Sequence, residues 1–277
     1  MKTVKDSASG SKSKPVTVPD FVKSKAAGRR LVMLTAYDFP SALLSDGAGV
    51  DAILVGDSVG TTVLGYETTV PVTMDEMLHH VKAVRKGVSR ALLIADLPFG
   101  AYQADPVEAF HNAARLIKEG GAHAVKLEGG ISIAPTIKLL TEAGIPVMGH
   151  IGLTPQSVFQ FGGHRAQGKT TEAATRLLED AAAVEAAGAF GIVLEGMPAE
   201  LSARITAQVS VPTIGIGAGP GCDGQVQVWH DILGLLPGKP FRHAKRYTEL
   251  TQVIHKAIEE YAEEVRSGDF PTKEHSI

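Results

Sequence analysis

The strongest constraint on the fold of this chain is a regular alternation of short apolar runs with longer segments of helical periodicity. From Leu31 onward, the candidate strands are runs rich in Val, Ile and Leu at residues 31–38, 52–57, 91–98, 124–130, 146–153, 190–196 and 211–219, with a possible eighth at 226–232. Nearly continuous apolar strands are typical of parallel sheets that are covered on both faces. The alternation therefore predicts an α/β protein built on a parallel sheet.

The segments between these runs carry helix signals. Residues 73–88, 105–121, 134–144 and 171–188 place apolar side chains at spacings of three and four, as one face of a helix requires. Thr73 precedes Glu76 by three residues, which is the pattern of a capping box. Asp105 followed by Pro106 reads as an N-cap and a first helical residue.

Two architectures fit this order of elements. Eight strand–helix units within about 250 residues match a (β/α)8 TIM barrel. A doubly wound open sheet is the main alternative, but it would normally carry a glycine-rich fingerprint after the first strand, where this chain reads "TAYDFPSA". We therefore predict a single-domain (β/α)8 barrel over residues 19–277. An amphipathic helix within residues 244–270 is expected to pack on the barrel or on a neighbouring subunit.

Composition and charge narrow the class of protein. The net charge of −3 gives no electrostatic reason to expect binding to nucleic acid or to an anionic membrane. Cys222 is the single cysteine, so no intrachain disulfide can form, and a reducing cytoplasm is the expected location. No apolar run approaches the roughly 20 residues that a membrane helix needs. Residues 1–18, rich in Lys and Ser at their start, are predicted to be a flexible tail.

Polar residues recur where the predicted strands end. In a parallel barrel all the carboxyl ends of the strands lie on one rim, so these residues would meet there. They are Asp38, Asp57, Ser58, Asp96, Lys126, Glu128, His150 and Glu195. Any one of the acids alone could simply cap the helix or turn that follows it. Acids gathered in a partly buried mouth, however, raise one another's pKa and cost stability unless a cation neutralises them.

Three of these acids suggest a metal site. Asp57, Asp96 and Glu128 come from adjacent predicted strands, and carboxylate oxygens are the ligands that Mg²⁺ prefers. Because Mg²⁺ usually keeps several waters, it would leave positions for a chelating substrate. We expect a Mg²⁺ site at this rim.

The remaining rim residues each allow two roles. Side chains alternate along a strand, so Lys126 and Glu128 point to one face and Leu127 to the other. Lys126 is then either a partner in a structural ion pair or the group that binds a substrate carboxylate. Glu195 follows the apolar stretch "GIVL" and is a candidate general base or a helix cap. His150 is either a hydrogen-bonded barrel histidine or a contact to the substrate.

Several motifs also resemble one known family. In order, the chain contains "TAYD", "VGDSVG", "ADLPFG", "AVKLEGG", "VMGHIGLTPQS", "GGHRAQGK", "IVLEGMP" and "TIGIGAGPGCDGQVQVWHDILGL". Between about Pro19 and Arg246 it resembles the ketopantoate hydroxymethyltransferase family. The resemblance implies a (β/α)8 barrel that transfers a hydroxymethyl group from 5,10-methylenetetrahydrofolate to 3-methyl-2-oxobutanoate. The products would be 2-dehydropantoate and tetrahydrofolate, in the first step of pantothenate synthesis.

The family's functional residues carry over by motif. The resemblance implies that Asp57, Asp96 and Glu128 bind Mg²⁺ and that Glu195 is the proton acceptor. The residues that it implies contact the oxo acid are Asp57, Ser58, Asp96 and Lys126. We assign His150 to orienting the substrate or the base. The family also implies a homodecamer of two pentameric rings.

Two alternative functions remain at this point. A carbon–carbon lyase of the phosphoenolpyruvate mutase and isocitrate lyase kind would share the barrel, Mg²⁺ and the keto-acid enolate. Such lyases commonly place a cysteine in a mobile loop at the active site, whereas Cys222 follows the seventh strand in a different motif. A barrel that binds a keto acid without catalysis is the other alternative, and it predicts binding without turnover.

Overall fold

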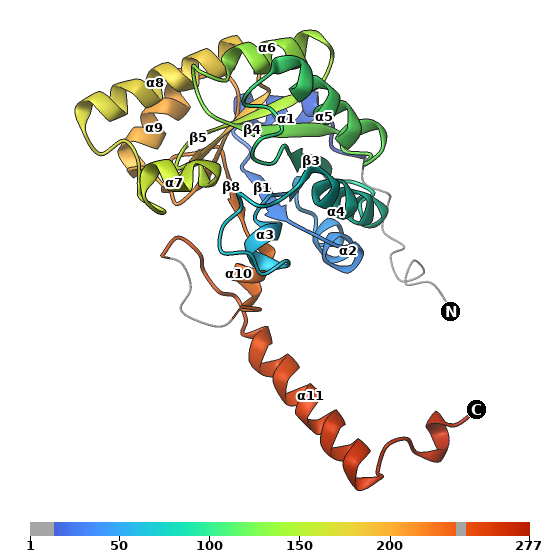
Figure 1. The fold of residues 1–277 in the computed structure, drawn as a ribbon. Helices are drawn as coiled ribbons and strands as arrows, with labels where there is room; N and C mark the ends of the chain where they lie inside the picture. Colours follow the sequence, from blue (N-terminus) through green and yellow to red (C-terminus); the bar gives the residue numbers. More distant parts are fainter. Residues whose placement is uncertain (1–13, 237–241) are drawn as a thin grey trace. The chain divides into compact units, whose positions relative to one another are not determined.

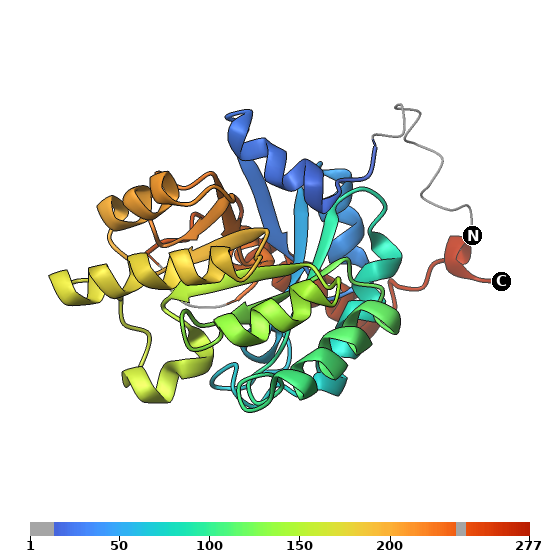
Figure 2. The ribbon, with the colours of Figure 1, turned by 90° about the horizontal axis from the view of Figure 1, so that it is seen from above.

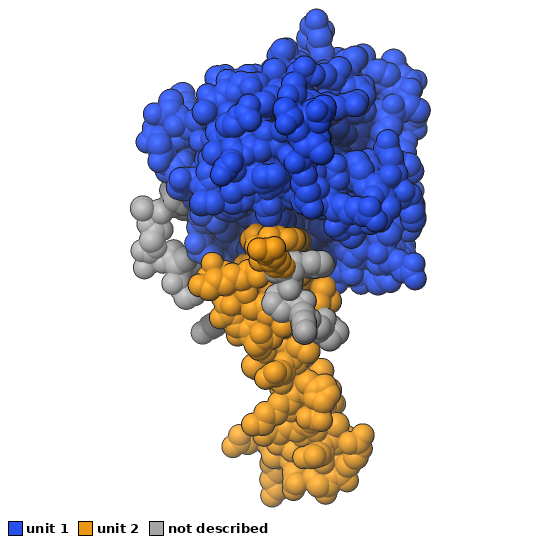
Figure 3. Space-filling model, turned by 90° about the vertical axis from the view of Figure 1, so that its left-hand side faces the viewer, with its two compact units in different colours: residues 1–226 blue, residues 227–277 orange. Residues whose placement is uncertain are grey.

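The computed structural model describes residues 14–236 and 242–277 and divides the chain into two compact units (Figures 1 and 3). The first unit comprises residues 1–226 and the second comprises residues 227–277. Most of the predicted tail, residues 1–13, lies outside the described residues. The first helix, α1 (Val18–Ala26), begins at residue 18, which was predicted to be the last residue of the tail.

A closed parallel barrel forms the first unit, as the alternation predicts (Figure 2). Within the described residues its strands follow one another in sequence order around the barrel. They are β1 (Leu31–Thr35), β2 (Ala52–Val55), β3 (Leu92–Asp96), β4 (Ala124–Glu128), β5 (Val147–Gly152), β6 (Gly191–Glu195), β7 (Thr213–Ile216) and β8 (Gly224–Gln227). The predicted (β/α)8 fold is confirmed.

The last strand differs from its prediction. β8 begins at Gly224, and residues 229–232, expected to continue the strand, belong instead to the helix α10 (Trp229–Leu233). Glycine is a poor strand residue, so the sequence pattern does not mark Gly224 as the start. Its missing side chain is needed here, because a Cβ at this position would lie 2.5 Å from the carbonyl oxygen of Leu31 in β1. Gly224 therefore allows the last strand to approach the first.

Helices surround the barrel and begin where the sequence predicts (Figure 2). Glu76 and Thr73 form the expected capping box, and the Asp105 carboxylate accepts a hydrogen bond from the Val107 N–H at 2.8 Å. The helices of this unit after α1 are α2 (Phe39–Gly47), α3 (Val59–Thr62), α4 (Met74–Gly87), α5 (Pro106–Lys118), α6 (Ala134–Glu142), α7 (Val158–Phe161), α8 (Thr171–Ala186) and α9 (Ala199–Gln208). A short 3₁₀ turn, η2 (Pro155–Ser157), follows β5.

Alternation along the strands separates two apolar layers. Leu93 and Leu127 point outward and pack in the layer beneath the helices. Leu31 and Met33 point inward and pack in the core of the barrel. Phe21 of α1 belongs to this inner cluster and is fully buried, with its ring 5.7 Å from that of Phe190. The aromatic ring of α1 thus fills the barrel at the amino ends of the strands.

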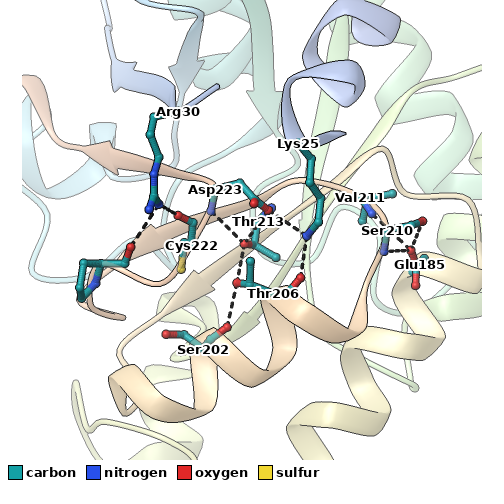
Figure 4. A network of polar contacts seen from close by, with 11 residues as sticks. Lys25, Arg30, Glu185, Ser202, Thr206, Ser210, Val211, Thr213, Cys222 and Asp223 are labelled. Carbon is teal, nitrogen blue, oxygen red and sulfur yellow. Dashed lines mark hydrogen bonds and ion pairs between the residues drawn. The ribbon is translucent and has the colours of Figure 1, made fainter. Parts of the chain in front are cut away.

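A polar network anchors α1 beneath the barrel (Figure 4). The Lys25 ammonium lies 3.0 Å from the Asp223 carboxylate and donates to the Thr206 carbonyl at 2.6 Å. Asp223 also accepts from the backbone N–H of Thr213 at 2.9 Å. Nearby, the Arg30 guanidinium donates to the carbonyl of Cys222. These contacts connect the first helix to α9, to β7 and to the segment that leads into β8.

The second unit contains α10, α11 (Leu250–Ser267) and the 3₁₀ turn η3 (Lys273–His275). The predicted amphipathic helix is observed as α11, which begins after residues 244–249. None of its side chains is buried, and its apolar members Ile258 and Tyr261 are exposed. In the part of the chain that the structure describes, no helix is long and apolar enough to cross a membrane.

Asp46 joins α2 to the strand that follows α4. Its carboxylate accepts the backbone N–H groups of Ala91, Ser89 and Arg90 at 2.7, 3.0 and 3.1 Å, just before β3 begins. Burial raises the pKa of the Asp46 carboxyl, but these hydrogen bonds outweigh it and hold the pKa below its ordinary value. The ionised carboxylate is therefore the form that stabilises this junction.

We expect Asp46→Ala to lower the free energy of unfolding at neutral pH by about 2–3 kcal/mol, because buried N–H groups lose a charged acceptor. Since the folded-state pKa is depressed, this contribution is present at neutral pH and is lost as the pH falls through the acid range. Urea denaturation at several pH values measures it. Asp75→Ala, at an exposed carboxylate paired with Arg115, is the matched control and should change little. Equal effects of the two substitutions would contradict this role of Asp46.

Candidate active site

The barrel brings six of the seven predicted site residues into one chain of contacts at the carboxyl ends of the strands. Strand register pairs Asp96 with Lys126, Glu128 with His150, and Gly152 with Glu195. Because side chains alternate along each strand, the charged members of these pairs all face the interior. Leu127 faces the outer layer, as predicted from "KLE". Sequence periodicity is therefore sufficient to place both Lys126 and Glu128 in the mouth.

Lys126 is the central cation of the site. Its ammonium lies 3.1 Å from Asp96 Oδ1 and 3.2 Å from His150 Nδ1, and the residue is only 4% exposed. Burial lowers the pKa of this ammonium, but Asp96, Glu128 and Asp57 together raise it above its ordinary value. Lys126 therefore stays charged at neutral pH.

His150 lies between two carboxylates. Its Nδ1 is 3.3 Å from Glu128 Oε1, and its Nε2 is 3.3 Å from Glu195 Oε2. Burial and Lys126 lower the pKa of the imidazole, yet Glu128 and Glu195 raise it to about 9. The close Lys126 ammonium can only donate a hydrogen bond, so it would favour an unprotonated Nδ1. The two carboxylates can only accept, so they favour N–H groups on both ring nitrogens. Because acids face both nitrogens, we assign the charged imidazolium form.

Asp57 is buried at the end of β2 and differs from the other acids in lacking a cation. Its backbone N–H donates to Asp96 Oδ2 at 3.0 Å, and its side chain accepts from Gln156 Nε2 at 2.9 Å. No basic side chain of the described residues lies within ion-pair distance of its carboxylate. Burial, followed by the negative charges of Asp96 and Glu128, raises the pKa of Asp57 well above its ordinary value.

Ser58 and Asp38 show the two outcomes for residues at strand ends. Ser58 is the N-cap residue just before α3, and its hydroxyl lies 2.7 Å from the hydroxyl of the buried Tyr37 beside the acids. Asp38 instead caps α2, where its carboxylate accepts the N–H of Ser41 at 2.7 Å. The simpler capping role therefore describes Asp38.

Sequence reasoning missed the residue that connects several of these groups. Gln156 lies in η2 after β5 and is 4% exposed. Besides its bond to Asp57, its backbone N–H donates to Glu128 Oε2 at 3.0 Å. Tyr102, also missed, hydrogen-bonds with Gln156 and with the backbone of Glu128. Only the position of Gln156 just past a strand end could have indicated it, because an uncharged side chain gives no charge signal.

The charge balance of the site fits a divalent cation. Asp57, Asp96, Glu128 and Glu195 meet only two cations, Lys126 and His150, so negative charge is in excess if all four acids ionise. In residues 14–236 and 242–277, no group of three or more His, Cys, Asp or Glu side chains converges closely enough to hold a metal ion. An ion here would thus be held directly by at most two of these side chains in this arrangement. Mg²⁺ suits such a site, because it typically binds one or two protein carboxylates and keeps several waters as its other ligands.

Comparison with known proteins gives a consistent match along the chain. Residues 15–273 match the family model described as ketopantoate hydroxymethyltransferase. A 3-methyl-2-oxobutanoate hydroxymethyltransferase from Pelobacter propionicus is 57% identical over 95% of this chain and 98% of its own. One from Moorella thermoacetica is 56% identical over 95% of this chain and 97% of its own.

Solved structures share the fold at much lower identity. A phosphonopyruvate hydrolase in complex with oxalate and Mg²⁺ is 16% identical, with a TM-score of 0.61 over 93% of both chains. A 2,3-dimethylmalate lyase of the PEP mutase/isocitrate lyase superfamily is 16% identical, with a TM-score of 0.58 over 94% of this chain and 91% of its own. At this identity the likeness shows a common architecture.

We expect Lys126→Met, without divalent metal, to lower the free energy of unfolding by about 3–5 kcal/mol at neutral pH, because buried acids lose their shared cation. Those acids would then have folded-state pKa values above their unfolded values, so protonation relieves the penalty. The loss should therefore be smaller at about pH 5 than at about pH 8. Chemical denaturation in EDTA measures both, with Lys138→Met at an exposed i,i+4 pair as the control. A loss that does not depend on pH would contradict this electrostatic role.

Proposed function

Because the chain belongs to the ketopantoate hydroxymethyltransferase family, we propose that it transfers a hydroxymethyl group from 5,10-methylenetetrahydrofolate to 3-methyl-2-oxobutanoate. With water as the further reactant, the products are 2-dehydropantoate and tetrahydrofolate, in the first step of pantothenate biosynthesis. The observation that carries this proposal is the buried Lys126 ammonium among acids at the mouth of the barrel. It offers a fixed positive charge to the carboxylate of an oxo acid, beside oxygen ligands for a metal.

Asp57, Asp96 and Glu128 would surround the metal, with Mg²⁺ as the favoured ion. In this arrangement at most two of them would bind it directly, and the third would bind it through a water that Mg²⁺ keeps. Their donor atoms are hard oxygens, and the excess of negative charge around Asp57 is what a divalent cation would neutralise. When bound, the ion would supply a Lewis acid that stabilises negative charge on the 2-oxo oxygen of the substrate.

The protein side chains bind the substrate and move its proton. Lys126 attracts the carboxylate of 3-methyl-2-oxobutanoate, and Ser58 donates a hydrogen bond to the same substrate. Glu195 accepts the proton from C3, and the resulting carbanion forms a carbon–carbon bond to the one-carbon unit of the folate. The bonds from this carbon to the folate nitrogens break, and water supplies the oxygen of the new hydroxyl group. The side chain of Glu195 keeps 18% of its surface exposed, so it can meet a substrate that enters from the mouth. His150, 3.3 Å from the Glu195 carboxylate, orients this base.

The position of Cys222 bears on the lyase alternative. Its carbonyl contacts Arg30, and it precedes Asp223 in the network beneath the barrel. Its side chain is buried, so it is not a mobile group at the mouth. This position disfavours a lyase that uses an active-site cysteine.

The proposed assembly rests on the family resemblance, and the proposed location rests on the single cysteine, Cys222. We propose a homodecamer of two pentameric rings in the cytoplasm. Sedimentation equilibrium of the purified protein would measure the number of subunits, and a monomer would contradict the assembly.

Purified protein should convert 3-methyl-2-oxobutanoate to 2-dehydropantoate when 5,10-methylenetetrahydrofolate and Mg²⁺ are both present. Mass spectrometry of the product measures this, and omission of the folate or addition of EDTA provides the controls. A folded protein that binds the oxo acid but gives no product at any Mg²⁺ concentration would support the non-catalytic alternative.

Glu195→Gln should still bind the oxo acid but should lose exchange of its C3 hydrogen for deuterium by about 10²–10⁴-fold, because the base is absent. Proton NMR in D₂O with Mg²⁺ and no folate follows this step alone. Glu200→Gln, at an exposed acid in α9, is the matched control. Exchange at the wild-type rate in Glu195→Gln would assign the base to another group.

A further inference from the structure

Gln156 makes as many side-chain hydrogen bonds as an amide can make. Its Nε2 donates to Asp57 Oδ2 at 2.9 Å and to the Leu97 carbonyl at 3.0 Å. Its Oε1 lies 2.8 Å from the Tyr102 hydroxyl and accepts from Gln103 Nε2 at 2.9 Å. A primary amide has two donors and two acceptor lone pairs, so every one of them is used. Such a network holds a buried side chain in a single orientation.

The chemistry of the four partners also fixes which way the amide points. On one side stand a carboxylate and a carbonyl, which only accept hydrogen bonds. On the other side stand a hydroxyl and the amide nitrogen of Gln103, which can donate. Turning the amide over would set its oxygen against the Asp57 carboxylate and lose both bonds on that side.

A second link runs from the backbone of the same residue. The Gln156 N–H donates to Glu128 Oε2 at 3.0 Å, while the Tyr102 hydroxyl accepts the Glu128 N–H at 3.0 Å. Among the described residues, Gln156 is the one that hydrogen-bonds to the carboxylates of both Asp57 and Glu128. It therefore sets the separation between acids that come from β2 and β4.

The bond to Asp57 also divides the roles of its two oxygens. Oδ2 is held by Gln156, and Oδ1 has no hydrogen-bond partner among the described residues. A carboxylate held through one oxygen cannot rotate freely, so the other oxygen keeps a fixed direction. Groups that orient the ligands of a metal in this way typically change metal affinity by about 10–100-fold when they are removed.

We infer that Gln156 is a positioning residue, which holds the Asp57 and Glu128 carboxylates in place for a divalent cation and the oxo acid. This inference rests on the proposed function, since it takes these acids to be the ones that hold the metal. A glutamine that only filled space in the core would contribute to stability and leave metal affinity unchanged.

Mn²⁺ binding to the full-length protein, followed by electron paramagnetic resonance of the free ion, tests the inference without turnover. Gln156→Met keeps the length of the side chain but removes both donors and both acceptors. We expect it to weaken Mn²⁺ binding by about 10–100-fold. Gln208→Met is the matched control, because Gln208 is an exposed glutamine of α9 that donates to the Leu178 carbonyl and bonds to neither acid. It should leave the Kd at the wild-type value, and thermal denaturation reports whether each variant folds.

The outcomes separate this inference from the proposed function. Wild-type protein that binds no Mn²⁺ would contradict the metal site and the positioning role together. Mn²⁺ binding that is equal in the wild type and in folded Gln156→Met would contradict the positioning role alone. If Gln156→Met does not fold, Tyr102→Phe decides, because it removes one of the groups that orient the amide. A weaker Kd in that variant supports the inference, and an unchanged Kd overturns it.

Discussion

Alternation of side chains in a closed parallel barrel is the constraint on which the rest of this structure depends. Every second residue of a strand points into one shared interior, so the character of that interior changes along the strands. At the amino ends it is apolar and is filled by Phe21 from α1. At the carboxyl ends the same positions hold Asp96, Lys126, Glu128 and His150. Because buried charges are costly unless they are paired, the charged residues at the carboxyl ends are stable only when they pair with one another in a network.

Much of this architecture could be predicted from the sequence, because the signals are local. Apolar runs locate the strands, and Thr73 and Asp105 mark helix starts that the structure reproduces. The period of two along "KLE" was sufficient to direct Lys126 and Glu128 to the same face. The start of β8 was missed because Gly224 is required by the close approach of β8 to β1, and no local propensity reports that contact.

The site was predictable where it is charged and not where it is neutral. Acids at strand ends are conspicuous, since they interrupt apolar runs. Gln156 and Tyr102 are as buried as the acids, but neither residue interrupts an apolar run. Their role is recognised only from hydrogen bonds to residues distant in the sequence, such as that of Gln156 to Asp57. For Asp38, the capping role that the sequence left open is the one observed, because its carboxylate accepts the N–H of Ser41 at the start of α2. The fold is shared with enzymes at 16% identity, so the identity of these side chains, more than the barrel, distinguishes the chemistry.

The anchoring of α1 has a consequence for the order in which the chain can fold. Lys25 and Asp223 are 198 residues apart in sequence, and the Lys25 contact to Thr206 spans 181 residues. Contacts of such separation form only after a long loop has closed, at an entropic cost that local contacts do not bear. On the ribosome, the Lys25 contacts must therefore wait until Thr206 and Asp223 have been synthesised.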